Sequence, residues 1–192
     1  GRPFIYDGVT YTVPQIRTVD PGTQHFLGAD APQSIGVGEQ YAWKSWSDGS
    51  GQYHAVFPDS NTTYTVNFVK QFFLTAAAGL GGTVSPPNAW YDSGSVAMIT
   101  AIGDPRYAFT QWKGTGPGSY TGTNNPASVL MNGPILDSAF FLPAFQVTFT
   151  TNPSGRSVTI DDSTFTTPKT VFWISRSIHT IATAPTQFGR TD

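Results

Sequence analysis

Few residues of this sequence have the chemistry that catalysis or metal binding requires. The 192 residues include three histidines, His25, His54 and His179, and no cysteine, which excludes disulfides and thiolate metal sites. His25 and His179 lie in matching segments, and neither has a second histidine nearby in the sequence. Such a histidine is typical of a hydrogen-bonded structural residue, because a metal site needs several ligands close together. The sequence therefore predicts no metal site.

The other reactive groups also lack the partners that a mechanism requires. Asp7 and Asp161–Asp162 lie at predicted hairpin turns, where an aspartate accepts hydrogen bonds from local amides. The segment 48–51 lacks the alternating acids and terminal glutamate of a calcium loop, and the glycine-rich segment 114–118 follows no βαβ unit. The serines have neither a nucleophile elbow nor an acid–histidine partner. We predict no catalytic residue, no cofactor and no enzymatic activity.

Composition excludes two classes of partner. Lys plus Arg number 10 and Asp plus Glu number 12, so the chain has no basic field to attract nucleic acid or an anionic membrane. No apolar run approaches the roughly 20 residues that a membrane-spanning helix needs. Charged residues are only 11%, while glycine and proline are abundant, which is typical of turn-rich antiparallel sheet. We expect neither nucleic-acid binding nor membrane insertion.

Two aromatic hexapeptides, 41–46 and 107–112, are near copies of each other. We predict that their rings form the structural core, because large aromatic side chains contribute much of the stability of a small unit. The predicted core residues are Tyr41, Trp43, Trp46, Tyr107, Phe109 and Trp112. In an extended strand, residues three positions apart project onto opposite faces. We therefore expect one ring of each such pair inside the core and the other at an edge or against a neighbouring unit.

A second match joins the two ends of the chain. Residues 7–14 align with residues 161–168, and the alignment holds as far as His25 with His179 and Gln33 with Gln187. Two kinds of unit that alternate along the chain explain both matches. We divide the chain into unit A (1–68, lacking its first strand), a complete unit B (69–142) and a third unit (143–192), which is the N-terminal part of a second A-type unit.

Local patterns predict strands throughout. Residues 145–151 alternate as a half-buried strand should, and residues 152–155 form a turn to a partner strand. No stretch of ten residues has the apolar spacing of an amphipathic helix. The best candidates for a single helical turn are 31–34 and 125–128. The fold class is therefore all-β, built from tandem small antiparallel modules.

One alternative assigns a binding role to aromatic residues. Trp90 and Tyr91 follow two prolines, and with Tyr120 they could present a surface that stacks on sugar rings. This predicts a carbohydrate-binding module rather than a structural one.

The motifs of unit B resemble a known bacterial repeat family. The resemblance lies in residues 81–86, 91–95, 107–109 with Trp112, and 125–131. Together they are similar to the bacterial repeat family also called the divergent internalin B-repeat. The resemblance implies a β-rich, β-grasp-like fold with at most one short helix per unit. It also implies an extracellular or cell-surface bacterial protein, in which such units act mostly as spacers.

The leading hypothesis is therefore a non-catalytic spacer or adhesive stalk of a large exported bacterial protein. Its expected partners are neighbouring repeat units, and in addition a polysaccharide or another surface protein. The segments 69–71 and 142–144 are read as short linkers, which predicts a semi-rigid rod. Because unit A lacks its opening strand, we expect an unpaired edge there, which leads either to strand exchange or to a shifted module boundary.

Overall fold

Residues 1–183 are described in this computed structural model, and they form strands and no helix. The all-β prediction is confirmed. Gln187 and the rest of 184–192 lie outside the described residues, and within 1–183 no helix is long and apolar enough to cross a membrane. The strands are β1 (Phe4–Tyr6), β2 (Val9–Tyr11), β3 (His25–Gly28), β4 (Gln33–Gly36), β5 (Glu39–Trp46), β6 (Tyr53–Val56), β7 (Val66–Ala78), β8 (Gly82–Ser85), β9 (Ala89–Asp92), β10 (Val96–Gly103), β11 (Tyr107–Thr115), β12 (Ala127–Leu130), β13 (Ile135–Phe149), β14 (Ser157–Ile160), β15 (Ser163–Thr166), β16 (Lys169–Ile174) and β17 (Ile181–Ala182).

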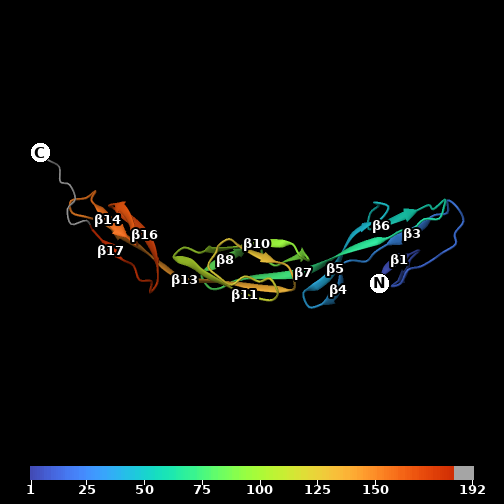
Figure 1. Ribbon diagram of the computed structural model, residues 1–192, viewed down its shortest axis with the longest axis horizontal. Helices are drawn as coiled ribbons and strands as arrows, with labels where there is room; N and C mark the ends of the chain where they lie inside the picture. The colour runs from blue at the N-terminus through green and yellow to red at the C-terminus, as the bar shows by residue number, and fades with distance from the viewer. Residues whose placement is uncertain (184–192) are drawn as a thin grey trace.

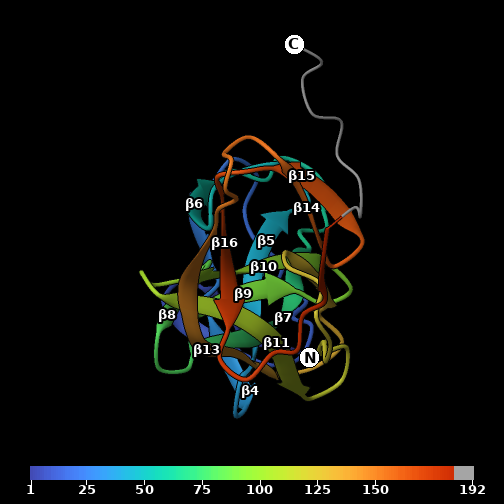
Figure 2. The same cartoon turned by 90° about the vertical axis from the view of Figure 1, so that its left-hand side faces the viewer.

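The molecule is elongated, with three β-rich lobes in a row (Figure 1). The lobe with β1, β3 and β6 lies at one end, and the lobe with β14, β16 and β17 lies at the other. In Figure 2, seen from the end that carries β14–β16, the remaining lobes lie behind. We call these lobes unit A, unit B and the third unit, after the units proposed from the sequence.

Strand β7 runs without a break from the first lobe into the second. Residues 66–72 pair antiparallel with β5, residues 71–74 pair antiparallel with β9, and residues 74–78 pair in parallel with β13. The first half of β7 thus closes unit A, and its second half opens unit B.

Strand β13 joins the second lobe to the third in the same way. Residues 136–143 pair with β11, whereas residues 144–149 pair with β16. The expectation that 69–71 and 142–144 are linkers is therefore wrong. Both segments lie inside continuous strands, because each shared strand finds hydrogen-bonding partners in two successive lobes.

Unit B has the larger core. Its fully buried residues include Trp112, Leu74 and Ile99, each with no exposed surface. Tyr107 and Phe109 are half-buried and pack against this cluster. The buried members are Phe72, Leu74, Ala76, Ala97, Ile99, Ala101, Trp112, Ala127, Val129, Met131, Ile135, Ala139 and Phe141.

Unit A has a much smaller core. Its buried members are Leu27, Ala29, Trp46 and Val56. Trp43 is half-buried and packs against them, and Tyr41 is half-buried beneath the guanidinium of Arg2, 4.1 Å from the ring centroid.

A β-bulge changes the facing of the aromatic residues in β11. The register against β13 shifts between Phe109 and Gln111, so Thr110 is an extra residue without a cross-strand partner. The bulge returns Trp112 to the face that carries Phe109, and their ring centroids lie 5.7 Å apart. The prediction that these two rings project onto opposite faces is wrong for this reason.

The same irregularity occurs in β5. Its register against β7 shifts between Trp43 and Ser45, which leaves Lys44 as the extra residue. Trp43 and Trp46 therefore belong to one core cluster rather than to two faces.

The helical turns predicted at 31–34 and 125–128 are also absent from residues 1–183. The Ala31–Pro32 and Asn125–Pro126 peptide bonds are cis, and strands β4 and β12 begin immediately after these prolines. In the second case Asn125 fixes the turn to β10, since its side chain accepts a hydrogen bond from Ala101 N–H (2.8 Å) and donates one to Ala101 O (2.7 Å).

Candidate functional site: two matching Asp–His–hydroxyl clusters

The first cluster lies at the β1–β2 turn of unit A. His25 Nδ1 lies 2.7 Å from Asp7 Oδ2, and His25 Nε2 lies 3.1 Å from the hydroxyl of Thr23. Asp7 Oδ1 accepts a hydrogen bond from Phe26 N–H at 2.7 Å. The ring of Tyr6 stacks on His25, with centroids 5.4 Å apart. The carboxylate therefore joins the hairpin turn to strand β3.

The second cluster repeats this geometry at the β14–β15 turn of the third unit. His179 Nδ1 lies 2.5 Å from Asp161 Oδ2, and its Nε2 lies 2.6 Å from Ser177 Oγ. Asp161 Oδ1 accepts a hydrogen bond from Thr180 N–H at 2.9 Å. Trp173 stacks on the imidazole, with centroids 4.1 Å apart and planes 5° from parallel.

Both aspartates occupy the left-handed backbone region, with φ of 48° at Asp7 and 47° at Asp161. Asp and Asn tolerate this region better than most residues, and two-residue hairpins require it. The hydrogen bond from His25, and then that from the Phe26 amide, hold the pKa of Asp7 below its usual range. The hydrogen bond from His179, followed by that from the Thr180 amide, lowers the pKa of Asp161 in the same way.

A hydroxyl, an imidazole and a carboxylate in this order also form the relay of serine hydrolases. In such a relay the hydroxyl gives its proton to the imidazole. Here Ser177 Oγ donates to Ile174 O at 2.6 Å, and Thr23 Oγ1 donates to Asp20 O at 2.6 Å. A hydroxyl has one proton, so a group that donates it to a carbonyl does not donate it to the imidazole. This arrangement favours a structural clamp over nucleophilic catalysis.

Sequence reasoning missed this pairing, and the prediction that no serine has an acid–histidine partner is wrong. Asp161 and His179 are 18 positions apart, and Asp7 and His25 have the same separation. The spacing repeats because the whole A-type unit repeats. That shared spacing was the available signal, since a histidine kept in register with an aspartate at a turn indicates that the two groups meet.

His54 and the segment 48–51 lie in unit A. His54 Nε2 lies 3.0 Å from Asp48 Oδ2, and Asp48 Oδ1 accepts a hydrogen bond from Ser50 N–H at 3.1 Å. The Gly49 amide donates to Trp46 O at 3.1 Å, which closes a turn. Within residues 1–183, no three His, Asp or Glu side chains form a group that could hold a metal ion.

The aromatic residues suggested for sugar binding do not form one surface. Tyr91 and Tyr120 are half-buried and pack against the core of unit B. Trp90 is 38% exposed and lies against Phe73, with centroids 5.0 Å apart. Since Trp90 and Tyr91 are consecutive in β9, their rings project onto opposite faces.

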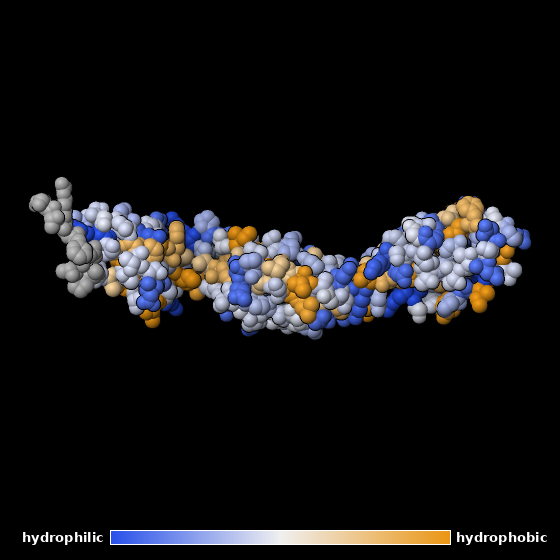
Figure 3. Space-filling model, turned by 45° about the horizontal axis from the view of Figure 1, so that its top comes forward, coloured by the Kyte–Doolittle hydropathy of each residue, from blue (hydrophilic) through white to orange (hydrophobic). Residues whose placement is uncertain are grey.

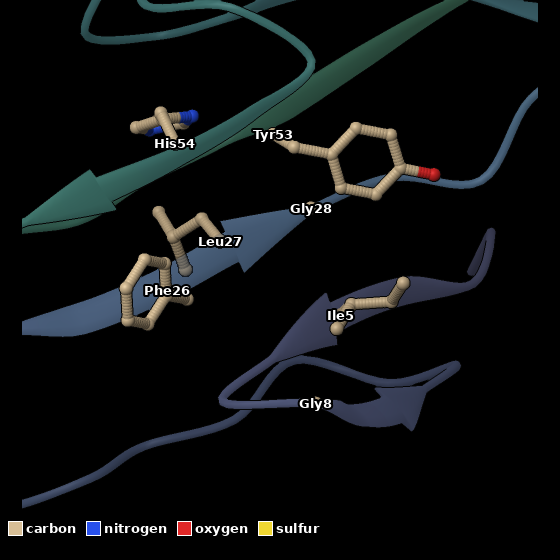
Figure 4. A pocket seen from close by; sticks show the side chains of 7 residues that line it. All are labelled: Ile5, Gly8, Phe26, Leu27, Gly28, Tyr53 and His54. Carbon is tan, nitrogen blue, oxygen red and sulfur yellow. The ribbon is translucent and has the colours of Figure 1, made fainter.

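A hollow of about 390 Å³ in unit A is lined by residues of β1, β3 and β6. Figure 4 shows the side chains around it, among them Ile5, Phe26 and Tyr53. The Tyr53 ring covers Gly28 so closely that a Cβ there would lie 2.5 Å from it. The Tyr53 hydroxyl donates to Asp30. On the face shown in Figure 3, apolar residues are scattered along the length rather than gathered in one patch.

Comparison with known protein families gives one match, in the central segment. The sequence profile of the divergent InlB B-repeat domain matches residues 72–144. No curated protein and no solved structure gives a significant match to the chain. The resemblance stated from the sequence is confirmed for the matched segment, which begins in β7 and ends in β13.

Proposed function

We propose that the chain is a non-catalytic spacer or adhesive stalk of a large exported bacterial protein, a role supported by the match of residues 72–144 to the divergent InlB B-repeat domain. In this proposal the neighbouring units of the same array are its main partners, and it acts at the cell surface or outside the cell. The single observation that carries the proposal is the sharing of strands between successive lobes.

The junction between units A and B supports a stiff connection. Gln40 on β5 is 9% exposed and donates to Gln71 Oε1 at 2.9 Å, and Gln71 in turn donates to Asp92 Oδ1 on β9 at 2.9 Å. This relay links three strands, one from each side of the junction and the shared one. Lys70 adds an ion pair with Glu39 at 2.9 Å.

The junction between unit B and the third unit is held by the backbone. Ala144 N–H donates to Arg106 O at 2.7 Å, and Ser175 N–H donates to Pro143 O at 2.7 Å. The backbone on both sides of the shared strand is therefore bonded within three residues of the lobe boundary. Such a connection resists bending between the lobes, whereas a flexible linker would not.

The Asp–His–hydroxyl clusters support the same function. Each fixes a tight turn to the strand that follows, and each hydroxyl is committed to a backbone carbonyl. They reinforce the two A-type units where a disulfide is excluded by the absence of cysteine. Of the three aromatic residues considered for sugar binding, Trp90 alone presents an exposed ring, so a structural role has more support.

Small-angle X-ray scattering tests the proposal. The chain should give the distance distribution of a rod, and an inserted Gly-Ser-Gly-Ser segment between Lys70 and Gln71 should broaden it, because the shared strand is then interrupted. The same insertion after Gly49, in an exposed turn, is the matched control and should leave the distribution unchanged. A compact particle, or equal effects of the two insertions, would refute the proposal.

A further inference from the structure

Unit B shows how the opening strand of a unit is seated. The second half of β7 lies between β9, which pairs with it antiparallel, and β13, which pairs with it in parallel. After β9 comes a turn in which Ser95 donates to Asp92 O twice, from N–H (3.0 Å) and from Oγ (2.6 Å). The opening strand contributes Phe72, Leu74 and Ala76 to the core.

The third unit repeats the first of these pairings. The second half of β13 pairs antiparallel with β16. After β16 comes the same turn, in which Ser177 donates to Ile174 O from N–H (3.0 Å) and from Oγ (2.6 Å). Unit B and the third unit thus bind the shared strand in the same way, by an antiparallel strand that is followed by this turn.

Unit A contains the same receiving segments without the strand. Its equivalent turn has Thr23 donating to Asp20 O from N–H (3.2 Å) and from Oγ1 (2.6 Å), and residues 17–20 precede it where β9 and β16 precede theirs. Residues 17–20 are not in a strand and pair with no strand of the described chain.

We call the place between residues 17–20 and residues 62–65 the seat of the opening strand. The side of the seat that would pair in parallel is also without a partner strand in the described chain. The match of the closing strands, in which Trp46 faces Val66 and Trp112 faces Ala139, aligns residues 62–65 with residues 135–138. Residues 135–138 pair with the opening strand of unit B, whereas 62–65 are not in a strand. Both flanks of an opening strand are therefore present in unit A, in the order that unit B uses.

The surroundings of this seat are apolar. Tyr6 and Tyr64 are half-buried against the small core, and Ile16 is 97% exposed. Another backbone contact also matches between units A and B. Gly22 N–H donates to Pro58 O in unit A, and Gly94 N–H donates to Met131 O in unit B, both at 2.8 Å. What differs is that no strand within residues 1–183 pairs with residues 17–20 or 62–65.

We propose that unit A is a receptor for one β-strand supplied by another polypeptide segment, with the chemistry of Ala144–Phe149. That segment is the opening strand of the other A-type unit, it carries no charge, and its own copy in this chain is already paired in β13. The ligand is thus an extended, uncharged segment with large apolar side chains at alternating positions, and it binds by adding a strand to the unit.

The register in unit B identifies the backbone groups that such a ligand would meet. Ser93 N–H donates to Lys70 O at 2.8 Å. Hydrogen-bonded pairs recur every two residues in an antiparallel ladder, so Tyr91 and Phe72 form the next bonded pair. The N–H of Tyr91 therefore points toward the opening strand, whereas that of Trp90 points away.

The third unit gives the same result. Ser175 N–H donates to Pro143 O at 2.7 Å, so Trp173 and Phe145 form the next bonded pair. Val19 is the equivalent of both Tyr91 and Trp173. The N–H of Val19 should therefore bond the incoming strand opposite the Phe145 position, while that of Thr18 should point away.

A synthetic peptide of residues 142–151 provides the direct test, titrated into the intact chain and followed by fluorescence anisotropy and amide hydrogen exchange. We expect saturable binding and new protection of the Val19 amide. Val19→Pro should weaken binding by about tenfold or more, because it removes the bonding N–H, whereas Thr18→Pro in the same segment should have little effect. Circular dichroism shows whether each variant keeps its fold.

A second pair of variants tests the proposal from the ligand side, without any change to the fold of the chain. In the peptide, Val147→Pro removes an N–H that faces the antiparallel flank of the seat. Gln146→Pro removes one that faces neither flank, since the equivalent Phe73 N–H of unit B donates to Gly38 O of the preceding unit. The first peptide should lose binding and the second should keep it. An absence of binding up to the solubility limit, or equal effects of the paired prolines, would overturn the proposal.

Discussion

Units A and B follow one plan, yet their cores differ greatly in size. Unit B buries a cluster of 13 residues, and unit A buries a cluster of four. Both have the bulged aromatic strand and the same closing pairing. The difference is the opening strand, which in unit B lies at the centre of the sheet and contributes three buried side chains.

This difference shows that the shared strand builds the lobe as well as connecting it. Trp112 is fully buried in unit B, while its equivalent Trp46 retains 4% exposure in a cluster surrounded by half-buried rings. A unit without its opening strand keeps its hairpins and turns, but it encloses less apolar surface. Since stability follows buried apolar area, we expect unit A to be the weaker lobe.

The largest effect should come from the equivalent tryptophans. Trp112→Ala should lower the free energy of unfolding of unit B by about 4 kcal/mol, because it leaves a large cavity in a closed core. Trp46→Ala should cost unit A clearly less, since a smaller and more open core collapses more easily around the gap. Native-state hydrogen exchange measures the two lobes separately. Equal losses would contradict the comparison.

Leu74 tests the contribution of the opening strand. It has no exposed surface, so Leu74→Ala should destabilise unit B by about 3 kcal/mol. The matched control is Leu142→Ala in the other shared strand, where the side chain is 46% exposed and a change within about 0.5 kcal/mol is expected. Chemical denaturation gives both values. A loss at Leu74 no larger than that at Leu142 would remove the central role of the opening strand.

Unit B also buries a carboxyl group that unit A lacks. Asp137 has no exposed surface, its Oδ1 accepts a hydrogen bond from Tyr120 N–H (3.1 Å), and its Oδ2 has no partner. Burial raises the pKa of Asp137, against a smaller opposing effect of the Tyr120 amide. The fold therefore favours the protonated acid, so stability is present below the unfolded pKa of about 3.9 and is lost as the pH rises through that value toward the folded pKa.

Asp137→Asn should consequently stabilise unit B at pH 7 by about 1 kcal/mol and should remove the decline in stability above pH 4. Asp104→Asn, at an exposed position of the same unit, is the control and should change neither. Thermal unfolding between pH 4 and 7 provides the measurement. A variant that is less stable than the parent at pH 7 would show that the carboxylate is well solvated or paired.

The smallest expected effect concerns the clamp of unit A. Because hydrogen bonds lower the pKa of Asp7, its contribution is present above the unfolded pKa of about 3.9 and is lost as the pH falls through the folded value. Asp7→Asn should reduce the stability of unit A at pH 6 by well under about 1 kcal/mol, since the group is exposed and screened. The exchange rate of the Phe26 amide reports it.

Asp161→Asn is the matched control for this prediction. It removes the equivalent clamp from the third unit, so it should raise the exchange rate of the Thr180 amide and leave Phe26 unchanged. A response at both sites from either variant would mean that the clamps do not act locally.

The sequence was sufficient to predict the all-β class, because alternation and turn residues are local signals that the strands retain. The aromatic hexapeptides were found from their repetition, but the bulges at Lys44 and Thr110 were not, since a bulge depends on the register of the partner strand. The same limitation explains why the sequence predicts linkers at 69–71 and 142–144, although both segments lie inside strands. Residues 142–144 include a proline and look like a break, yet the neighbours on each side hold them in β13.

The clamp clusters were missed for a related reason. Each residue was recognised, but Asp161 and His179 meet only after the β14–β15 hairpin folds back against the following strand. The sequence places Trp90 and Tyr91 after two prolines, which predicts an exposed surface that Tyr120 completes. Burial depends on which face of β9 packs on the core, and a strand that begins after two prolines gives no local indication of that face.

The sharing of strands between lobes is tested most directly by hydrogen exchange at two amides. Phe73 N–H donates to Gly38 O (2.9 Å) across the first junction, and Ala144 N–H donates to Arg106 O (2.7 Å) at the second. In the native chain both amides should exchange as slowly as those in the middle of β7 and β13. Exchange of either amide at the rate of an unstructured peptide would mean that the lobes are joined by linkers, and it would contradict the account.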